Sequence, residues 1–353
     1  MNHKNADNSA LTHSQGRRVT LKDVAAEAGV SVAAVSKVVR SAYGVSESMR
    51  TRVQTAIDKL GYRPDVGARA MRGHSYTVGV VGPHLSSFFV TEVIEAIVNH
   101  FEFTPYDVTI MVSGADGNQQ IHAVDGLLDR KVDGLILVAP WTSFEFLEQT
   151  GRIVPMVAVA RHGKSQHYDT VVDDDDEGAR QAIDHLVSLG HQRIAHIGQM
   201  VGPNLSHPLS HVVRQQGYEG AMRDHGLEPD VLVTAYSDDG GYEAAKELLK
   251  RKSPPTAIFA GADVAALGAL RAIEEAGLRV PEDISLVGYD NISFTSVKRI
   301  SLTTVDQSSS LTGEAAARLL QERMDTGRTR AVRHVLAPSL IVRETTAEPP
   351  RAS

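Results

Sequence analysis

Residues 19–62, VTLKDVAAEAGVSVAAVSKVVRSAYGVSESMRTRVQTAIDKLGY, decide how the beginning of this chain folds. Their pattern predicts three short helices, each begun by a residue whose side chain can cap a helix, namely Thr20, Ser31 and Ser46. Gly29 separates the first two helices, because a residue without a Cβ takes the left-handed turn that ends a helix at little cost. A turn this short between two amphipathic helices predicts a helix-turn-helix.

The same residues resemble the headpiece of the lactose-repressor (LacI/GalR) family of transcription regulators. The resemblance rests on VTLKDVAAEAGVS, on VSKVV, on the Val45-Ser46 cap and on LGYRP, and it continues to MRG at residues 71–73. It implies that the second helix enters the major groove of DNA. A small helical bundle that binds protein, or nothing, is the alternative, and the polar or small face of the second helix argues against it.

Side chains near the N-terminus of the second helix reach base edges most easily. The residues there are Val32, Ala33, Ser36 and Lys37. In the family the first two of these positions carry most operator choice, and because both are apolar here, the lysine carries more of the polar base recognition. Contacts to phosphate, or equally solvated surface positions, are predicted for Thr20, Arg40, Ser46 and Arg50.

Residues 63–75 form a short segment that contains Pro64 and Gly67. Seven or eight residues with a glycine do not sustain a helix alone, so we expect this segment to be disordered away from DNA. The family resemblance implies a hinge helix that folds when two copies pair in the minor groove and insert an apolar side chain between base pairs. By that resemblance the DNA-contacting residues are Ala68, Arg69 and the inserting Met71. A plain flexible linker is the alternative.

Charge divides the chain into two parts. Residues 1–74 contain 12 Lys and Arg against 6 Asp and Glu, whereas the remaining residues contain 24 against 37. A basic end attracts phosphates and an acidic body repels them, so this division predicts a separate nucleic-acid module. With 353 residues, 42% of them hydrophobic, the chain can hold two or three domains. The polar residues 1–18 are expected to be a disordered tail.

The chain has no cysteine, which excludes disulfides, thiolate metal sites and a cysteine nucleophile. Its start lacks the apolar run of a signal peptide, and no stretch is apolar for long enough to span a bilayer. We therefore expect a cytoplasmic protein that associates with the nucleoid through DNA and has no membrane partner.

From Thr77 onward, short β-rich runs alternate with amphipathic helical stretches, and the alternation begins again at residues 193–200, RIAHIGQM. Such alternation predicts parallel sheets covered by helices on both faces. This part resembles the two-lobed periplasmic-binding-protein-like core of the same repressors. The expected fold class is therefore α/β, with an all-α helix-turn-helix head and a two-lobed parallel-sheet core in residues 76–346. Lobe 1 is expected to comprise about 76–175 and 306–337, and lobe 2 about 176–305 and 338–346, followed by a tail at 347–353.

Ligands of open parallel sheets bind beyond the carboxyl ends of the strands. Aromatic and charged residues near those ends are the candidates for an effector site, namely Phe88, Phe89, Trp141, Arg161, Arg214, Tyr236, Asp263 and Asp290. Aromatic planes stack on the flat face of a sugar, while carboxylate and guanidinium groups bind paired hydroxyls. A sugar is therefore the favoured effector.

The family resemblance gives some of these candidates more specific roles. It implies effector contacts for Arg214 and Asp290, and aromatic walls at Tyr236 and at Phe88 or Phe89. Ordinary packing remains the alternative for the aromatic residues of the first lobe. Because Ala262 departs from a polar residue found in some sugar-binding relatives, the sequence does not identify the particular sugar.

Motifs for metals, cofactors and catalysis are missing from the sequence. Residues 173–177 are five consecutive acids, which suit the N-terminus of a helix better than a metal site. The histidines match no zinc spacing, and there is no P-loop, dinucleotide fingerprint, HExxH or GxSxG, so we expect no metal, no cofactor and no enzyme. Two alternatives stay open: a sugar-binding transport protein, and a sugar-processing enzyme that uses Asp263 and Asp290 as a pair. Asp263 equally suits a helix cap.

The three parts together predict a mechanism. A repressor binds a pseudo-palindromic operator as a homodimer, or as a tetramer built from such dimers. The effector closes one lobe on the other and changes the spacing of the paired hinge segments, so that ligand binding and DNA binding are coupled. Operator sequence and regulated genes do not follow from the sequence.

Overall fold

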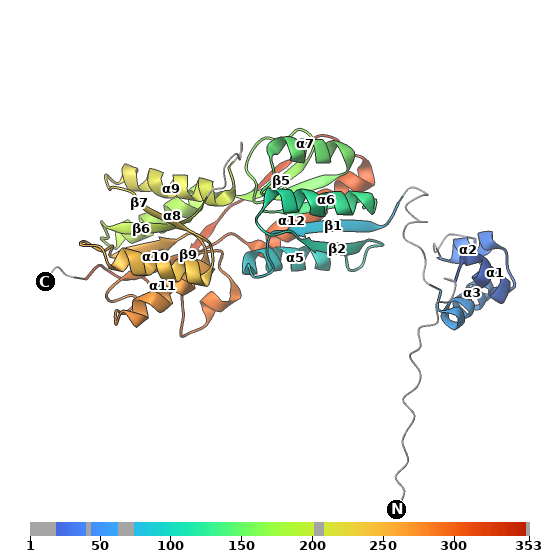
Figure 1. Cartoon of the computed structure of the whole chain (residues 1–353), viewed down its shortest axis with the longest axis horizontal. Coiled ribbons are helices and arrows are strands. Elements are labelled where there is room, and N and C mark those ends of the chain that lie inside the picture. The colour runs from blue at the N-terminus through green and yellow to red at the C-terminus, as the bar shows by residue number, and fades with distance from the viewer. Residues whose placement is uncertain (1–18, 40–43, 63–73, 201–207, 351–353) are drawn as a thin grey trace, which may run out of the picture. The chain divides into compact units, whose positions relative to one another are not determined.

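The computed structural model describes residues 19–39, 44–62, 74–200 and 208–350, which fall into two units that divide between Ser75 and Tyr76 (Figure 1). We call the first unit the head and the second the core. The expectations for the N-terminal tail and for the hinge helix lie outside the described residues.

The head contains α1 (Leu21–Ala28), α2 (Val32–Val39) and α3 (Glu47–Leu60). The predicted caps account for their starts: the Ser31 hydroxyl accepts a hydrogen bond from the Ala34 backbone N–H at 3.1 Å, and the Ser46 hydroxyl accepts one from Met49 at 3.4 Å. Gly29 ends α1 with a φ of 64°, which confirms the predicted left-handed turn. The helix-turn-helix is thus set by local residues.

A small apolar core holds the three helices together. Val24 of α1, Val35 of α2 and Val53 of α3 are fully buried in one cluster, which Tyr62 completes. Because the apolar residues of α2 at positions 35 and 38 point into this cluster, the opposite side of the helix is left for other contacts.

Lobe 1 of the core is built on an all-parallel sheet with strand order β11-β5-β4-β3-β1-β2. Its strands are β1 (Thr77–Gly82), β2 (Asp107–Val112), β3 (Gly134–Val138), β4 (Met156–Val159), β5 (Asp169–Asp173) and β11 (Arg333–Leu336). One face packs against α5 (Phe88–Phe101) and α12 (Ser309–Thr326), and the other against α6 (Gly117–Asp129) and α7 (Phe144–Ile153). The buried strands are continuous apolar runs, as a sheet covered on both faces requires.

Lobe 2 repeats this plan with strand order β12-β10-β9-β8-β6-β7, in which only β12 is antiparallel to its neighbour. Its strands are β6 (Ile194–Gln199), β7 (Asp230–Thr234), β8 (Ala257–Ala260), β9 (Ser285–Tyr289), β10 (Thr303–Asp306) and β12 (Ser339–Ile341). The helices are α8 (Asp175–Ser188) and α9 (Ser210–Asp224) on one face, and α10 (Asp238–Leu249) and α11 (Asp263–Glu275) on the other. Figure 1 shows the two lobes side by side.

The described chain passes between the lobes after β5, after β10 and after β11. Residues next to these crossings, such as Asp175 and Gln307, therefore lie where the two lobes meet. The carboxyl ends of parallel strands also meet at one edge of each sheet, which is where ligands of such sheets bind.

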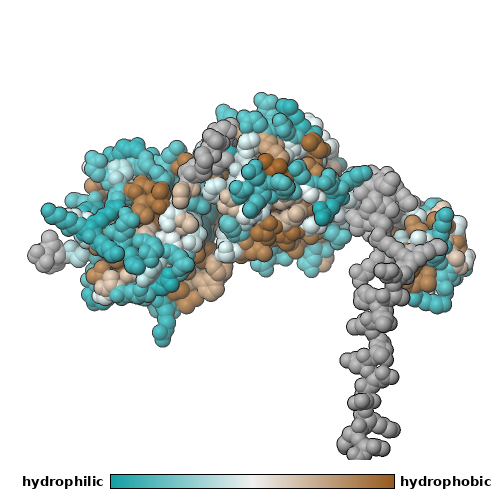
Figure 2. All heavy atoms as spheres, in the orientation of Figure 1, coloured by the Kyte–Doolittle hydropathy of each residue, from teal (hydrophilic) through white to brown (hydrophobic). Residues whose placement is uncertain are grey.

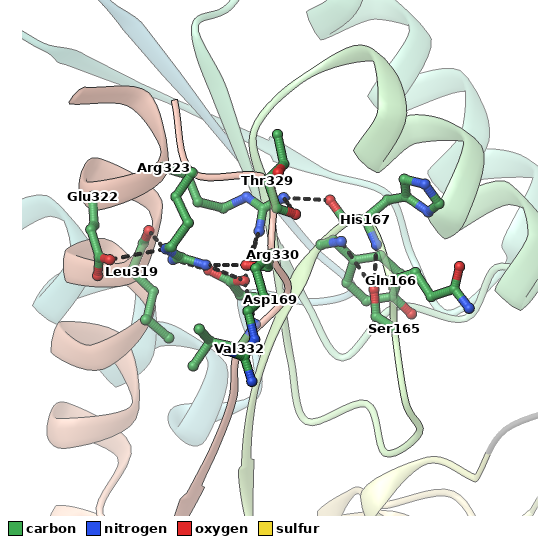
Figure 3. Close-up of polar contacts among 12 residues, drawn as sticks. Ser165, Gln166, His167, Asp169, Leu319, Glu322, Arg323, Thr329, Arg330 and Val332 are labelled. Carbon is green, nitrogen blue, oxygen red and sulfur yellow. Dashed lines mark hydrogen bonds and ion pairs between the residues drawn. The ribbon is translucent and has the colours of Figure 1, made fainter. Parts of the chain in front are cut away.

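A buried carboxylate fixes the last return of the chain to lobe 1 (Figure 3). Asp169, at the start of β5, accepts hydrogen bonds from Arg323 at 2.8 Å, from Arg328 at 2.7 Å and from the Val332 backbone N–H at 2.8 Å. Burial without these partners would cost several kcal/mol, so the two arginines and the carboxylate must be kept together. The cluster joins α12 to β5 just before the chain enters β11.

No helix in the described part of the chain combines the length and apolarity that a membrane crossing would need.

Candidate functional site

The outward face of α2 carries the residues predicted to meet DNA bases. Val32 is 41% exposed, Ala33 and Lys37 are exposed, and Ser36 is half-buried. These positions alternate with the buried Val35 and Val38 as the 3.6-residue period of a helix requires. The head therefore presents a continuous helical surface of small side chains with one cation.

The predicted phosphate contacts lie at the starts of the other two helices. Thr20 and Ser46 are exposed N-cap residues of α1 and α3, and Arg50 is half-buried in the first turn of α3. Helix N-termini offer backbone N–H groups to phosphate, so these positions are suited to DNA. Arg40, Ala68, Arg69 and Met71 lie outside the described residues.

A cavity of ≈ 150 Å³ lies in the core between the strand ends of the two lobes. Six of the eight predicted effector residues line it: Phe88, Phe89 and Trp141 from lobe 1, and Arg214, Tyr236 and Asp290 from lobe 2. The cavity brings together residues that are up to about 200 positions apart in the sequence, as strand ends of a two-lobed α/β fold do.

Arg214 is held by a buried ion pair. It is 4% exposed, its Nη2 lies 2.7 Å from a carboxylate oxygen of Asp175, and its Nη1 donates to the carbonyl oxygen of Gly261. The guanidinium also lies over the Tyr289 ring, 3.4 Å from its centre. His162 of lobe 1 donates to the other oxygen of Asp175 at 2.8 Å. Asp175 thus connects the two lobes next to the cavity.

The charge of Asp175 is fixed by these partners. Burial alone would raise its pKa, but Arg214 and then His162 outweigh burial and hold the pKa below its ordinary value. In turn, the same carboxylate outweighs the burial of the guanidinium and raises the pKa of Arg214. The pair is therefore ionised at neutral pH, and the guanidinium is rigidly placed.

Asp290 supplies a carboxyl group on the cavity wall. Its Oδ1 accepts a hydrogen bond from the side-chain amide of Gln307, which lies at the second crossing between the lobes. Burial raises the pKa of Asp290 to about 7, although Arg214 and Gln307 act in the opposite direction. Its φ of 122° lies in the left-handed region, which side chains rarely adopt, so the backbone is strained where it presents this carboxyl group.

Aromatic rings from the two lobes meet around the cavity. Trp141 of lobe 1 stacks on His211 of lobe 2, with ring centres 5.8 Å apart and planes inclined by 24°. Phe88 meets Phe294 of lobe 2 edge to face at 5.0 Å. These pairs form ring contacts between lobes beside the polar groups of Arg214 and Asp290.

The structure does not bring the other two predicted effector residues to the cavity. Arg161 is fully buried, and its guanidinium donates to the carbonyl oxygens of Pro140 and Thr142 at 3.5 and 3.3 Å. Asp263 accepts from the Thr304 hydroxyl at 2.6 Å and from the Ile292 N–H at 2.9 Å. Both side chains thus satisfy backbone or neighbouring groups beside the cleft.

The position of Asp263 bears on two alternative roles, a helix cap and one member of a catalytic acid pair. It is the first residue of α11, and the N-cap position is Ala262, so it does not cap the helix. Burial, and then the charge of Asp290, raise the pKa of Asp263 well above its ordinary value. An acid pair facing a substrate, as a sugar-processing enzyme would need, is not what this arrangement offers.

Sequence reasoning missed several cavity residues. His211, Gln307 and Gln199 line the cavity, and Asp175 supports it from behind. His211 is the second residue of α9, and Gln307 lies between a strand and a helix that belong to different lobes. The only signal available was their position at or next to the end of an element, which many residues share.

The five acids at residues 173–177 have different roles. Asp174 caps α8 by accepting from the Glu177 N–H at 3.3 Å, as expected for a helix N-terminus. Asp173 instead accepts from the Tyr289 hydroxyl at 2.5 Å, Asp175 pairs with Arg214, and Asp176 pairs with Arg180 on the surface. The prediction that helix-terminal charge explains the whole run was therefore incomplete. Among the described residues, no three acids, histidines or cysteines are grouped so as to hold a metal ion.

Both units of the chain match known protein families. The profile of bacterial regulatory proteins of the lacI family matches residues 20–65, and the periplasmic binding protein-like domain matches residues 183–346. The HTH-type transcriptional repressor PurR of Erwinia tasmaniensis is 34% identical over 342 residues, which cover 94% of this chain and 98% of that protein.

Two solved structures are similar to this chain over nearly its whole length. The lac repressor dimer bound to operator and the anti-inducer ONPF is 30% identical with a TM-score of 0.81, covering 94% of this chain and 100% of that one. The complex of the transcriptional regulator CelR with cellobiose is 31% identical with a TM-score of 0.68, covering 93% and 100%.

A helix-turn-helix head and a two-lobed core, with an aromatic-walled cavity that Arg214 and Asp290 line, define a ligand-responsive DNA-binding transcriptional regulator. Both halves of this description have counterparts in the relatives, which are themselves regulators. The chain belongs to the lacI family of bacterial regulatory proteins.

Proposed function

We propose that this protein is a repressor that binds a pseudo-palindromic operator as a homodimer and is released from it when a small sugar binds between the lobes of the core. The observation that carries the proposal is the cavity in which the paired Arg214, the carboxyl group of Asp290 and the ring of Trp141 meet, in the same chain as a helix-turn-helix. Guanidinium and carboxylate bind the paired hydroxyls of a sugar, and an aromatic ring covers its apolar face.

The relatives support both sides of the proposal. One structural relative is a repressor dimer bound to operator, and another is a regulator in complex with cellobiose. The proposed effector contacts are those candidates that line the cavity, namely Phe88, Phe89, Trp141, Arg214, Tyr236 and Asp290. The proposed base contacts are Val32, Ala33, Ser36 and Lys37, and the remaining predicted contacts of the head and hinge stay part of the proposal.

An exposed apolar face on lobe 1 supports association of two copies. Ile110 and Val112 lie on one face of the edge strand β2 and are 42% and 51% exposed, and Val98 of α5 is 38% exposed. Figure 2 shows apolar residues gathered over α5 and β2. Contiguous apolar surface on a sheet edge marks an interaction site, and a dimer places two recognition helices on two half-sites.

Selection from a random duplex library tests the DNA side of the proposal. The full-length protein should enrich an inverted repeat, and its affinity for that repeat should fall steeply with salt. Lys37→Ala should weaken binding to the selected site about 5- to 150-fold, because a polar base contact contributes about 1–3 kcal/mol.

The matched control is Lys59→Ala, which removes the same charge from a lysine of α3 that is paired with Glu27 of α1. It should change binding to the selected site only a few-fold. Equal losses in the two variants would show that Lys37 acts only through net charge, and failure to enrich any inverted repeat would contradict operator binding.

A further inference from the structure

We infer that the effector is an uncharged compound with a single polyhydroxylated ring, and that Trp141 and His211 set this limit. The inference rests on the proposed function and narrows its ligand. It is not general to the relatives, since one of them binds cellobiose, a sugar of two rings.

The size of the cavity supports one ring. Its volume is ≈ 150 Å³, and an apolar cavity of about this volume in another protein holds a single benzene ring. The stack of Trp141 on His211 joins the two lobes at the wall of the cavity, and the contact of Phe88 with Phe294 joins the lobes a second time. A second sugar ring would have to separate at least one of these pairs.

The charges argue against an anionic ligand such as a sugar phosphate. Of the described residues that line the cavity, Arg214 is the one Arg or Lys, and both of its terminal nitrogens are engaged, one with Asp175 and one with the Gly261 carbonyl. Asp290 places a carboxyl group on the same wall. A phosphate needs several free donors and a net positive site, and this wall offers neither.

Unsatisfied polar atoms argue for hydroxyl groups. His211 Nε2 and Arg214 Nε are buried without a hydrogen-bond partner, in side chains that are more than nine-tenths buried and line the cavity. Burial, and then the charge of Arg214, hold the pKa of His211 at about 4, so its ring is neutral and carries one donor and one acceptor nitrogen. A hydroxyl both donates and accepts, so a ring with several hydroxyls satisfies His211, Arg214 and Asp290 together.

Ligand-induced thermal stabilisation of the full-length protein tests this inference, because a ligand that binds only the folded state raises Tm by mass action. The probes are D-glucose, D-galactose, D-mannose, D-ribose and D-xylose, with glucose 6-phosphate and ribose 5-phosphate as charged counterparts. Cellobiose and lactose test two rings, and adenine and hypoxanthine test a flat base. At least one neutral monosaccharide should raise Tm, whereas its phosphate and the disaccharides should not.

Two variants then test the named residues. Trp141→Ala and His211→Ala should each lower the affinity for the responding monosaccharide at least tenfold, as measured by calorimetry. Each variant should also allow a disaccharide to raise Tm. Circular dichroism and operator affinity equal to wild type would show that each variant is folded; His211→Gln keeps a polar side chain and should show the smaller loss. If both alanine variants still fail to bind disaccharides, Trp141 and His211 do not determine the ligand specificity.

A preferred response to a phosphate, a disaccharide or a base, or no response to any neutral monosaccharide, overturns the inference. The same preparations are measured on operator DNA. If the protein binds operator but responds to a different class of ligand, the proposed function as a DNA-binding regulator is still supported. If the protein does not bind operator, the proposed function itself is contradicted.

Discussion

Replacing Asp175 by Asn tests whether the buried ion pair beside the cavity organises the core. The side chain of Asp175 is fully buried and accepts from Arg214 and His162 at 2.7 and 2.8 Å. Asparagine has nearly the same shape, so the variant removes the charge and leaves the buried Arg214 guanidinium without its ion-pair partner. Breaking a buried pair in this way costs about 3–5 kcal/mol.

The neighbouring Asp176 provides the control. It belongs to the same run of acids, but its pair with Arg180 lies at the surface, where its side chain is 48% exposed. Surface pairs contribute only about 0.2–1 kcal/mol. At about 2 °C per kcal/mol for a unit of this size, Asp175→Asn should lower Tm by roughly 6–10 °C and Asp176→Asn by about 2 °C or less.

Fluorescence of the single tryptophan, Trp141, reports unfolding of the core in the full-length protein. The folded-state pKa of Asp175 lies below the ordinary value of an aspartate. The ionised carboxylate therefore contributes its full share to the stability of the folded state above a pH of about 4, and this share is lost as the pH falls through the folded-state pKa. The difference between wild type and Asp175→Asn should therefore be full at neutral pH and shrink in strong acid. Equal, small losses for the two variants would refute the reasoning and return both residues to the role of helix-terminal charges.

Four further outcomes follow from the structure. Burial raises the pKa of Asp290 to about 7, so the ionised form that accepts sugar hydroxyls is lost on acidification; affinity measured by calorimetry should fall about tenfold from a pH of about 8 to about 6, and Asp290→Asn should abolish this dependence. The raised pKa also means that the contribution of Asp290 to stability declines as pH rises from about 4 through 7. Gly29→Ala should destabilise the head by about 1–2 kcal/mol in a circular-dichroism melt, since a Cβ there meets no atom within 4 Å and only the left-handed backbone opposes it; an unchanged melt would contradict the strain argument. Ile110→Glu should convert the dimer to monomers in sedimentation velocity, and a dimer of unchanged affinity would place the interface elsewhere.

The elements that local chemistry determines were predictable from sequence. Ser31, Ser46 and Gly29 mark helix ends by their own hydrogen bonds and backbone freedom, so the head follows from its sequence. The apolar runs became strands β1 to β4 of lobe 1 and β6 to β9 of lobe 2 for the same reason. The strand β5, in contrast, was not singled out, because its Asp169 and Asp173 are buried by partners from α12 and β9 that no local pattern reveals.

The cavity was predictable in outline and not in detail. Position after a strand placed Trp141 and Asp290 correctly at its wall, since strand ends share one edge of the sheet. Position did not determine side-chain direction, so Arg161 and Asp263 were expected there and instead satisfy neighbouring groups. The partnership of Arg214 with Asp175 depends on how the chain crosses between lobes, which is a property of the whole fold.

The most direct test of the central claim is the operator affinity of the full-length protein, measured by fluorescence anisotropy with and without saturating effector. Coupling energies of about 1–3 kcal/mol correspond to changes in operator affinity of roughly 5- to 150-fold. Bound operator must lower the affinity of the protein for the effector by the same factor. We predict a loss of operator affinity within that range for wild type and no effector response for Asp290→Ala, with its basal operator binding intact. Operator affinity that stays the same at saturating effector, or a full response in Asp290→Ala, would contradict the account.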